Sequence, residues 1–196
     1  MNKLEGFYEL SRMGIPSVPW KKYDNAVLLD DNMLWTIRSA VMSGHDLNLP
    51  RKVGVTADEA KKFAEGLKEK LNEDDLILYY PFFIAEKSGV MEIARDRVVI
   101  EAVKEDLWNL VTFNHRDVTI IISNTDISYV GNDKFIETHE LEELLSYSGK
   151  VKQKFRDIML DGKSVFLEWS YAFISDKKKM PVGERHLVFY EIRSVA

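Results

Sequence analysis

The chain has 196 residues, of which 45% are hydrophobic and 30% are charged, a composition typical of a folded globular protein. Its net charge of −5 argues against a nucleic-acid partner, and no apolar run is long enough to span a membrane. The absence of cysteine excludes disulfides, thiol chemistry and thiolate-bound metal, and it fits a cytoplasmic protein. A single glutamine beside much lysine, glutamate, isoleucine and valine is typical of a thermophile.

The first predicted elements are a helix and a buried strand. Apolar residues recur at helical spacing over residues 4–13, and Gly14 follows as a C-cap. Residues 15–20 contain two prolines and are expected to be extended. Residues 33–41 are predicted to form a buried strand that carries one charge, Arg38. An arginine inside an apolar strand pairs with an anion, which is either a structural carboxylate or a ligand phosphate.

The middle of the chain predicts alternating loops, strands and helices. A loop is expected over residues 42–51, and Thr56 with Glu59 has the spacing of a capping box that begins a helix. A strand is predicted over residues 76–84, where Pro81 indicates an edge or a bulge. Further strands are predicted over residues 88–93, after a turn, and over residues 98–103 and 118–123, with a hairpin turn within residues 129–136 and a helix over residues 137–156.

Two segments near the C-terminus are rich in β-branched and aromatic residues and predict an antiparallel hairpin. They are residues 164–174 and 186–194, separated by a charged stretch that contains glycine and proline. Because side chains alternate along a strand, each strand is expected to place one glutamate on a shared face. The sets predicted to share a face are Phe166, Glu168 and Ser170 on the first strand, and Phe189, Glu191 and Arg193 on the second.

The two strand glutamates allow two interpretations. They are either solvent-facing residues on the wet side of an antiparallel sheet, or a pair of carboxylates that holds Mg²⁺ and a polyphosphate together with Arg193. Burial of an isolated glutamate in an apolar strand is costly without a cation or a donor, which favours a specific site.

The mixture of helices and adjacent hairpins predicts an α+β fold with a mostly antiparallel sheet. We expect a single compact domain over residues 1–196, with subdomains at residues 1–95 and 96–196. The sequence contains no Walker P-loop, no G-x-G-x-x-G motif, no nucleophile elbow and no H-E-x-x-H helix. The usual nucleotide-binding and hydrolytic motifs therefore give no support to those functions.

Short motifs in chain order resemble the ATP-grasp-like nucleotide-binding domain of phosphoenolpyruvate synthase and pyruvate phosphate dikinase. The resemblance covers nearly the whole chain, although each motif is short. Its segments are residues 3–19 (an opening lysine helix followed by Gly-Ile-Pro-Ser-Val-Pro), Ile-Arg-Ser-Ala at 37–40, Ala-Glu-Lys-Ser-Gly-Val at 85–90, Val-Ile-Glu-Ala at 99–102, Phe-Leu-Glu-Trp-Ser at 166–170 and Leu-Val-Phe-Tyr-Glu-Ile-Arg-Ser-Val at 187–195. The resemblance implies a domain that closes over ATP and Mg²⁺ and starts phosphoryl transfer to a histidine on a partner domain.

Carried over residue by residue, the resemblance implies a nucleotide site with bound metal. Phosphates would be contacted by Lys3, Arg38 and Arg193. Glu101 would lie near the nucleotide, and Glu168 and Glu191 would hold Mg²⁺, with Glu191 in place of the family's glutamine. The partner implied is a protein that carries a phosphorylatable histidine.

The departures from the family pattern leave alternatives open. The family's glycine-rich phosphate loop is replaced by residues 43–51, which contain one glycine, and a second glycine motif is replaced by residues 105–108. The first hypothesis is an ATP- and Mg²⁺-binding protein that transfers a phosphoryl group with the help of a partner. The second is a catalytically degenerate binding or regulatory module of the same fold, and the third is an unrelated α+β domain. The sequence does not decide whether the chain is an enzyme.

Overall fold

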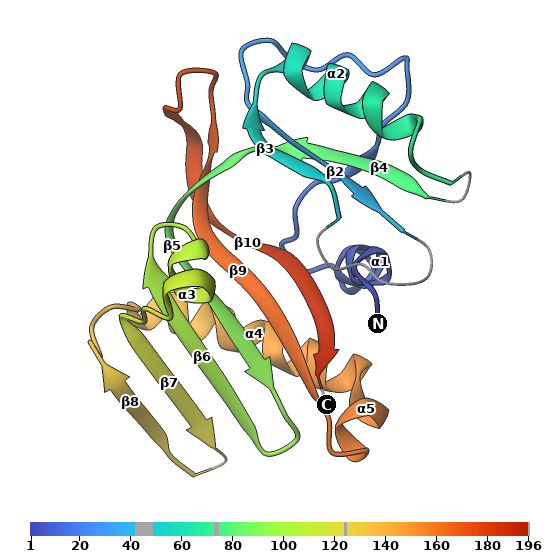
Figure 1. The fold of residues 1–196 in the computed structure, drawn as a ribbon. Coiled ribbons are helices and arrows are strands. Elements are labelled where there is room, and N and C mark those ends of the chain that lie inside the picture. The colour runs from blue at the N-terminus through green and yellow to red at the C-terminus, as the bar shows by residue number, and fades with distance from the viewer. Residues whose placement is uncertain (42–48, 73–74, 124, 196) are drawn as a thin grey trace.

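The computed structural model describes residues 1–41, 49–72, 75–123 and 125–195, which form two antiparallel sheets with helices packed on them (Figure 1). The smaller sheet has the strand order β1-β4-β2-β3, formed by Lys21–Lys22 (β1), Trp35–Ala40 (β2), Arg51–Val55 (β3) and Leu76–Pro81 (β4). The larger sheet has the order β10-β9-β5-β6-β7-β8, formed by Phe83–Ile93 (β5), Arg97–Lys104 (β6), Val118–Ser123 (β7), Ile127–Gly131 (β8), Ser164–Ser175 (β9) and Pro181–Val195 (β10). This arrangement confirms the predicted α+β class with largely antiparallel sheets.

Helices pack on both sheets, and two of them border the space between the sheets. The helices are Lys3–Met13 (α1), Ala57–Lys68 (α2), Trp108–Phe113 (α3), Thr138–Lys154 (α4) and Arg156–Leu160 (α5). Figure 1 shows α2 over the smaller sheet, and α3 and α4 on opposite faces of the larger one. The main core lies between α4 and the larger sheet, whereas α1 lies against β10. Within the described residues, no helix combines the length and the apolar character that crossing a bilayer requires.

The predicted helix caps are confirmed. Gly14 follows α1 with φ 59°, the left-handed conformation that glycine adopts at low cost. The Asn2 side chain accepts from the amide of Glu5 at the other end of the same helix. Thr56 and Glu59 form the capping box expected at the start of α2. Local sequence signals therefore set both helices.

The chain passes from one sheet to the other at Phe82, where the sequence predicted one strand over residues 76–84. Pro81 ends β4, because it has no amide hydrogen to continue the ladder. The Phe82 amide donates to the Leu34 carbonyl oxygen over 2.8 Å, and the Phe82 carbonyl accepts from the Ser175 amide over 3.0 Å. β5 then continues without the predicted turn, and a register shift between Ala85 and Lys87 takes its place.

Two elements of the structure were not predicted from the sequence, and one predicted turn is wrong. Residues 51–55 form β3, an edge strand with exposed charges and a glycine. Its apolar and polar residues do not alternate clearly, so the sequence did not predict a strand there. The short helix α3 was not predicted. The hairpin turn expected within residues 129–136 is wrong, because residues 127–131 form β8 and pair with β7. The loop expected over residues 42–51 lies mostly outside the described residues.

Gly89 on β5 lies where the larger sheet has no room for a side chain. A Cβ atom at this position would lie 2.4 Å from the Trp169 ring and 2.3 Å from the Glu101 carbonyl oxygen. Trp169 is fully buried in the core beneath β5 and β9. The absence of a side chain at residue 89 therefore makes room for the indole against β5.

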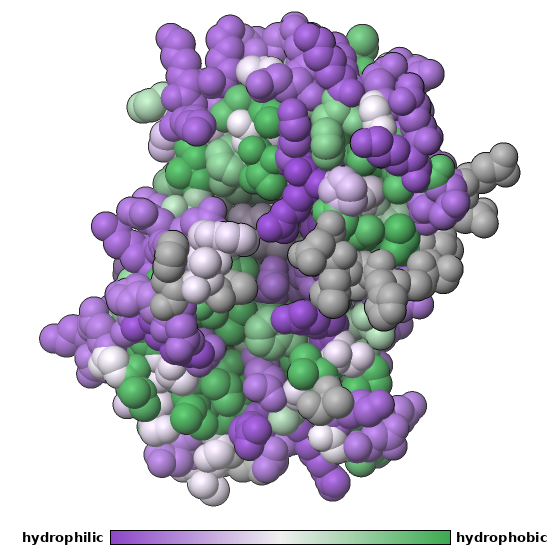
Figure 2. Space-filling model, viewed as in Figure 1, coloured by the Kyte–Doolittle hydropathy of each residue, from purple (hydrophilic) through white to green (hydrophobic). Residues whose placement is uncertain are grey.

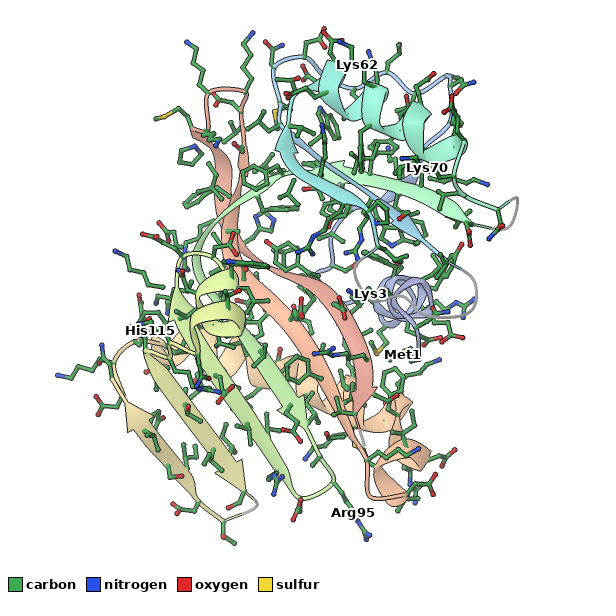
Figure 3. All side chains as sticks on the ribbon, in the orientation of Figure 1. Met1, Lys3, Lys62, Lys70, Arg95 and His115 are labelled. Atoms are coloured by element: carbon green, nitrogen blue, oxygen red, sulfur yellow. The ribbon has the colours of Figure 1, made fainter. Side chains whose placement is uncertain are left out.

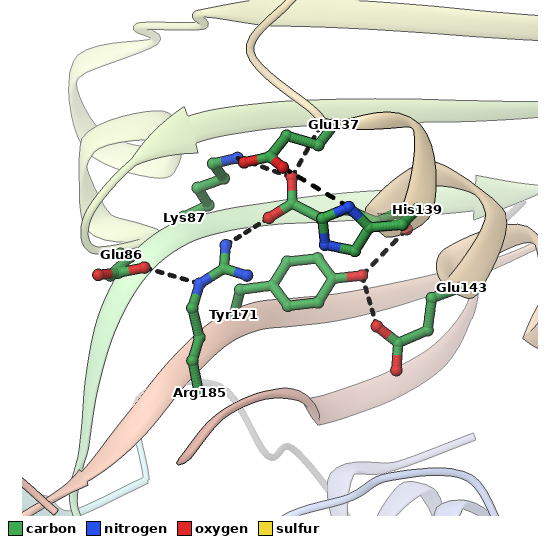
Figure 4. Close-up of polar contacts among 8 residues, drawn as sticks. Glu86, Lys87, Glu137, His139, Glu143, Tyr171 and Arg185 are labelled. Carbon is green, nitrogen blue, oxygen red and sulfur yellow. Dashed lines mark hydrogen bonds and ion pairs between the residues drawn. The ribbon is translucent and has the colours of Figure 1, made fainter.

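A buried ionic network joins the start of α4 to the hairpin of β9 and β10 (Figure 4). The Glu140 carboxylate is fully buried and accepts from Lys87 Nζ over 2.7 Å, from the Glu137 amide over 2.9 Å, and from Arg185. Arg185 also pairs with Glu86 at 2.6 Å. Burial alone would raise the pKa of Glu140, but the bonds from Lys87, Arg185 and the Glu137 amide outweigh it, so the pKa is lowered.

We expect Glu140→Gln to destabilise the protein by about 2–4 kcal/mol, because it leaves two half-buried cations without their buried carboxylate. Urea unfolding at pH 7 measures the change. Glu142→Gln is the matched control, since Glu142 lies on the exposed side of the same helix and its loss should cost less than about 0.5 kcal/mol. Equal effects of the two substitutions would show that the network does not stabilise the fold.

Candidate functional site

A cleft of about 380 Å³ lies between the two sheets, and Figure 2 shows the hollow at mid-height of the molecule. This volume is within the range of small-molecule sites. Every wall contributes side chains: α1, β2 and β3 from one side, and β5, β9, β10 and the start of α3 from the other. Four of the six residues predicted from the sequence line it, namely Lys3, Arg38, Glu168 and Glu191.

The two predicted carboxylates are brought together by a bulge in β10. Glu191 lies directly opposite Glu168, whereas Phe189 lies opposite Trp169, so Tyr190 is the extra residue. The expectation that Phe189 shares a face with Glu191 is therefore wrong. Phe189 enters the core, and both glutamates turn toward the cleft. A sequence prediction that assumes strict alternation misses this bulge, because one extra residue moves all later side chains of the strand to the opposite face.

The carboxylate pair is surrounded by cations. Two effects raise the pKa of Glu168 to about 6: burial is the larger, and repulsion from Glu191 is the smaller. The charges of Arg193, Lys3 and Arg38 oppose this rise. Lys3 Nζ lies 3.5 Å from the Glu191 carboxylate, and Figure 3 shows Lys3 on the side of α1 that faces β10. The site thus holds two like charges at the floor of a cleft, which a cation can relieve.

Arg38 is buried without a matching carboxylate. Its side chain is 7% exposed, its guanidinium carbon lies 5.3 Å from the centre of the Phe7 ring, and its Nε has no hydrogen-bond partner. Among the described residues, no carboxylate lies within ion-pair distance of Arg38. Of the two anions considered from the sequence, a structural carboxylate is therefore not seen in this part of the chain, and the guanidinium lines the cleft instead.

The other two predicted residues lie outside the lining of the cleft. Glu101 stands in the same row of the sheet as Glu168, with Val90 between them, but its carboxylate pairs with Arg116 at 2.5 Å. Arg193 is exposed and stacks on Phe166, with 4.8 Å from its guanidinium carbon to the ring centre. Arg193 lies near the site, since its charge lowers the pKa of Glu168. The charge of Glu101, in contrast, is already matched by Arg116.

Several residues of the cleft were not found by sequence reasoning. They are Arg51 on β3, Asp106, Leu107 and Trp108 at the start of α3, and a hydroxyl pair formed by Ser88 and Ser170, whose oxygens lie 2.7 Å apart. No local pattern marks them, because β3 and α3 reach the cleft only through tertiary packing. The loop compared with a phosphate loop, residues 43–51, lies largely outside the described residues.

The cleft is polarised along the strands. At the crossover between the sheets its walls are aromatic or aliphatic, with Tyr80, Phe82 and Phe83 among them. Arg38 is two residues farther from that crossover than Thr36, which pairs with Tyr80. Glu168 is likewise beyond Ser170 on the larger sheet. The apolar end therefore lies beside the crossover, and the charged end lies beyond it.

The candidate metal ligands of the site are the two paired carboxylates, Glu168 and Glu191. Across the described ranges, no group of three or more histidine, aspartate or glutamate side chains is placed to hold a metal ion. A fully protein-made metal cage is thus not present in this part of the chain. Two adjacent carboxylates fit a Mg²⁺ ion, which keeps several waters and is commonly shared with phosphate oxygens.

Comparisons with known proteins give a weak structural likeness. No protein-family model matches the chain, and no curated protein matches it. Among solved structures, the chain is similar to the macrocyclase MdnC bound with precursor peptide MdnA from Microcystis aeruginosa MRC, with 13% sequence identity and a TM-score of 0.41. The match covers 97% of this chain and 51% of the other, so this chain spans about half the length of that structure. A likeness at this level carries no argument about activity.

These comparisons correct one expectation from the sequence. Kinship with phosphoenolpyruvate synthase and pyruvate phosphate dikinase rested on short motifs in chain order. It is wrong, because no family model and no curated protein matches the chain. A partner with a phosphorylatable histidine was implied by that kinship alone and loses its support. The geometry of the cleft does not depend on it.

The raised pKa of Glu168 predicts a pH-dependent effect of Glu168→Gln on stability. The pKa is about 6 in the folded state and 4.5 without the fold, so wild-type stability falls as pH rises through this window. We expect Glu168→Gln to be more stable than wild type by about 2 kcal/mol at pH 7.5, and the difference to vanish near pH 4.

Urea midpoints at the two pH values measure this difference. Glu101→Gln is the control, because it removes a carboxylate of the same sheet row that already has Arg116 as its partner. A pH-independent effect of Glu168→Gln would contradict the prediction.

Proposed function

We propose that the cleft between the two sheets binds a magnesium-complexed nucleoside triphosphate. The observation that carries the proposal is the meeting of a carboxylate pair, Glu168 and Glu191, with the buried guanidinium of Arg38 in one cavity. This arrangement suits a divalent cation bound to a polyanion. The cation would offset the repulsion between the two carboxylates, and the polyanion would give Arg38 an anionic partner.

The polarity of the cleft supports one orientation of the nucleotide. A base would lie against the apolar end at the crossover, where Tyr80, Phe82 and Trp108 offer aromatic surfaces. The phosphates would then reach the charged end, toward Arg38 and Lys3. A triphosphate with its counterion joins the two ends, whereas a purely apolar or a purely anionic ligand would fill only one of them.

The residues at the charged end have separable roles. Glu168 and Glu191 would hold Mg²⁺, and a bound Mg²⁺ ion would neutralise phosphate oxygens. Arg38 and Lys3 would hold phosphate oxygens directly. Arg193 stands outside the lining, and it would contribute through charge alone unless its exposed side chain turns inward. Glu101 has no role in this proposal, since Arg116 occupies its carboxylate.

Phosphoryl transfer to an acceptor is the finer form of the proposal. Its support is the surplus of positive groups around the place where phosphate charge would develop, which is the main requirement of such catalysis. The alternative is a binding or regulatory module that holds the nucleotide without turnover. Single-turnover assays with radiolabelled ATP separate the two, because only the enzyme releases or transfers the terminal phosphate.

We expect Mg-ATP to bind wild-type protein with micromolar affinity, and Glu168→Gln or Glu191→Gln to weaken this binding by about tenfold or more, since each removes a charged ligand of the cation. Isothermal titration calorimetry with ATP and excess Mg²⁺ measures it. Repeating the titration in EDTA should abolish the difference between wild type and both variants.

Glu101→Gln is the matched control for this experiment. It removes one negative charge from the same row of the sheet and should leave the affinity within about twofold of wild type, because its carboxylate lies outside the cleft. No binding of Mg-ATP at millimolar concentration would overturn the proposed function, and an equal loss in all three variants would place the metal elsewhere.

A further inference from the structure

Two arginines stand directly opposite each other at the charged end of the cleft. Arg38 on β2 is paired in register with Arg51 on β3, and both line the cavity. Side chains of directly opposite residues leave the sheet on the same face, with Cβ atoms about 5 Å apart. Like charges in this arrangement destabilise a sheet. The pairing therefore needs a physical reason.

The protein does not neutralise this pair within the part of the chain that the structure describes. There, no carboxylate lies within ion-pair distance of either guanidinium, and the Nε of the buried Arg38 has no hydrogen-bond partner. The neighbour of Arg51 behaves differently. Lys52 leaves the opposite face of β3, and its Nζ lies 5.5 Å from the centre of the Phe63 ring of α2. The unmatched positive charge is thus confined to the face that meets the cleft.

We propose that Arg38 and Arg51 form an anion clamp for the polyphosphate tail of the ligand, with Arg51 as a binding residue that neither the sequence motifs nor the comparisons assign. The clamp rests on the proposed function and names the part of the ligand that this wall takes. Two forked guanidiniums on adjacent strands match the oxygens of linked phosphates better than they match a single carboxylate. An anion between them converts their mutual repulsion into attraction toward a shared partner.

The clamp makes affinity depend on the number of phosphates. A nucleoside monophosphate places its one phosphate near the base and reaches the clamp least, whereas ATP and inorganic tripolyphosphate reach both arginines. Arg51 is exposed and its replacement leaves no cavity, so its variants should fold. The same replacement removes a like-charge opposition from the unliganded sheet. Loss of binding is therefore expected together with a gain in stability, which a merely structural arginine would not show.

The test compares Arg51→Ala with Lys52→Ala, two exposed cations on one strand that face opposite ways. Calorimetry uses Mg-ATP, Mg-tripolyphosphate and AMP as separate ligands. Arg51→Ala is expected to weaken ATP and tripolyphosphate about tenfold or more and to leave AMP within about twofold. Arg51→Lys should recover part of the loss. Thermal unfolding without ligand should show Tm of Arg51→Ala raised by about 1–3 °C, and Tm of Lys52→Ala unchanged or lowered.

The outcomes separate the clamp from the nucleotide site. Binding of ATP that is weakened equally by both alanine variants overturns the clamp and leaves the proposed function standing. Binding of tripolyphosphate that depends on Arg51, with no preference for ATP, supports the clamp and removes the nucleotide from the proposal. Failure of all three ligands to bind overturns both.

Discussion

The pairing of Glu191 with Glu168 is the contact on which the site depends, and one inserted residue produces it. Tyr190 bulges from β10, so the strand changes phase between Phe189 in the core and Glu191 in the cleft. Without the bulge, with Tyr190 paired like any other strand residue, Phe189 and Glu191 would share one face, so either Glu191 would enter the apolar core or Phe189 would enter the charged cavity. Because of the bulge, β10 contributes Phe189 to the core of the larger sheet and Glu191 to the carboxylate pair in the cleft.

The same principle holds on the opposite wall of the cleft. The smaller sheet packs one face on α2 and turns the other toward the cavity, so neighbouring residues of β3 meet different surroundings. The charges that the fold can match are matched, as the network around Glu140 shows. The charges at the cleft are left without complete partners. A fold that satisfies a buried glutamate so fully in one place and leaves Arg38 Nε unpaired in another distinguishes structural polar groups from groups set aside for a ligand.

Sequence reasoning reached the elements whose signals are local. The caps at Gly14 and Thr56 and the C-terminal hairpin follow from short-range chemistry, and the glutamates were found because a charge in an apolar strand is conspicuous. Arg51 and Trp108 could not be found this way, since each reaches the cleft through the position of a whole element. The family resemblance erred for the opposite reason: three-residue matches such as Ile-Glu-Ala recur in many strands, and Glu101 within that match pairs with Arg116 instead of a ligand.

The contact between Gly89 and the Trp169 ring has a consequence for tracing the ancestry of this chain. A side chain at residue 89 would meet both the indole and the Glu101 carbonyl oxygen, and Trp169 is the immediate neighbour of Glu168 along its strand. Position 89 must therefore stay glycine while the three strands keep this spacing, whatever core residue stands at position 169. A profile that gives this one column a high weight could recognise remote kin whose surface residues have diverged beyond detection.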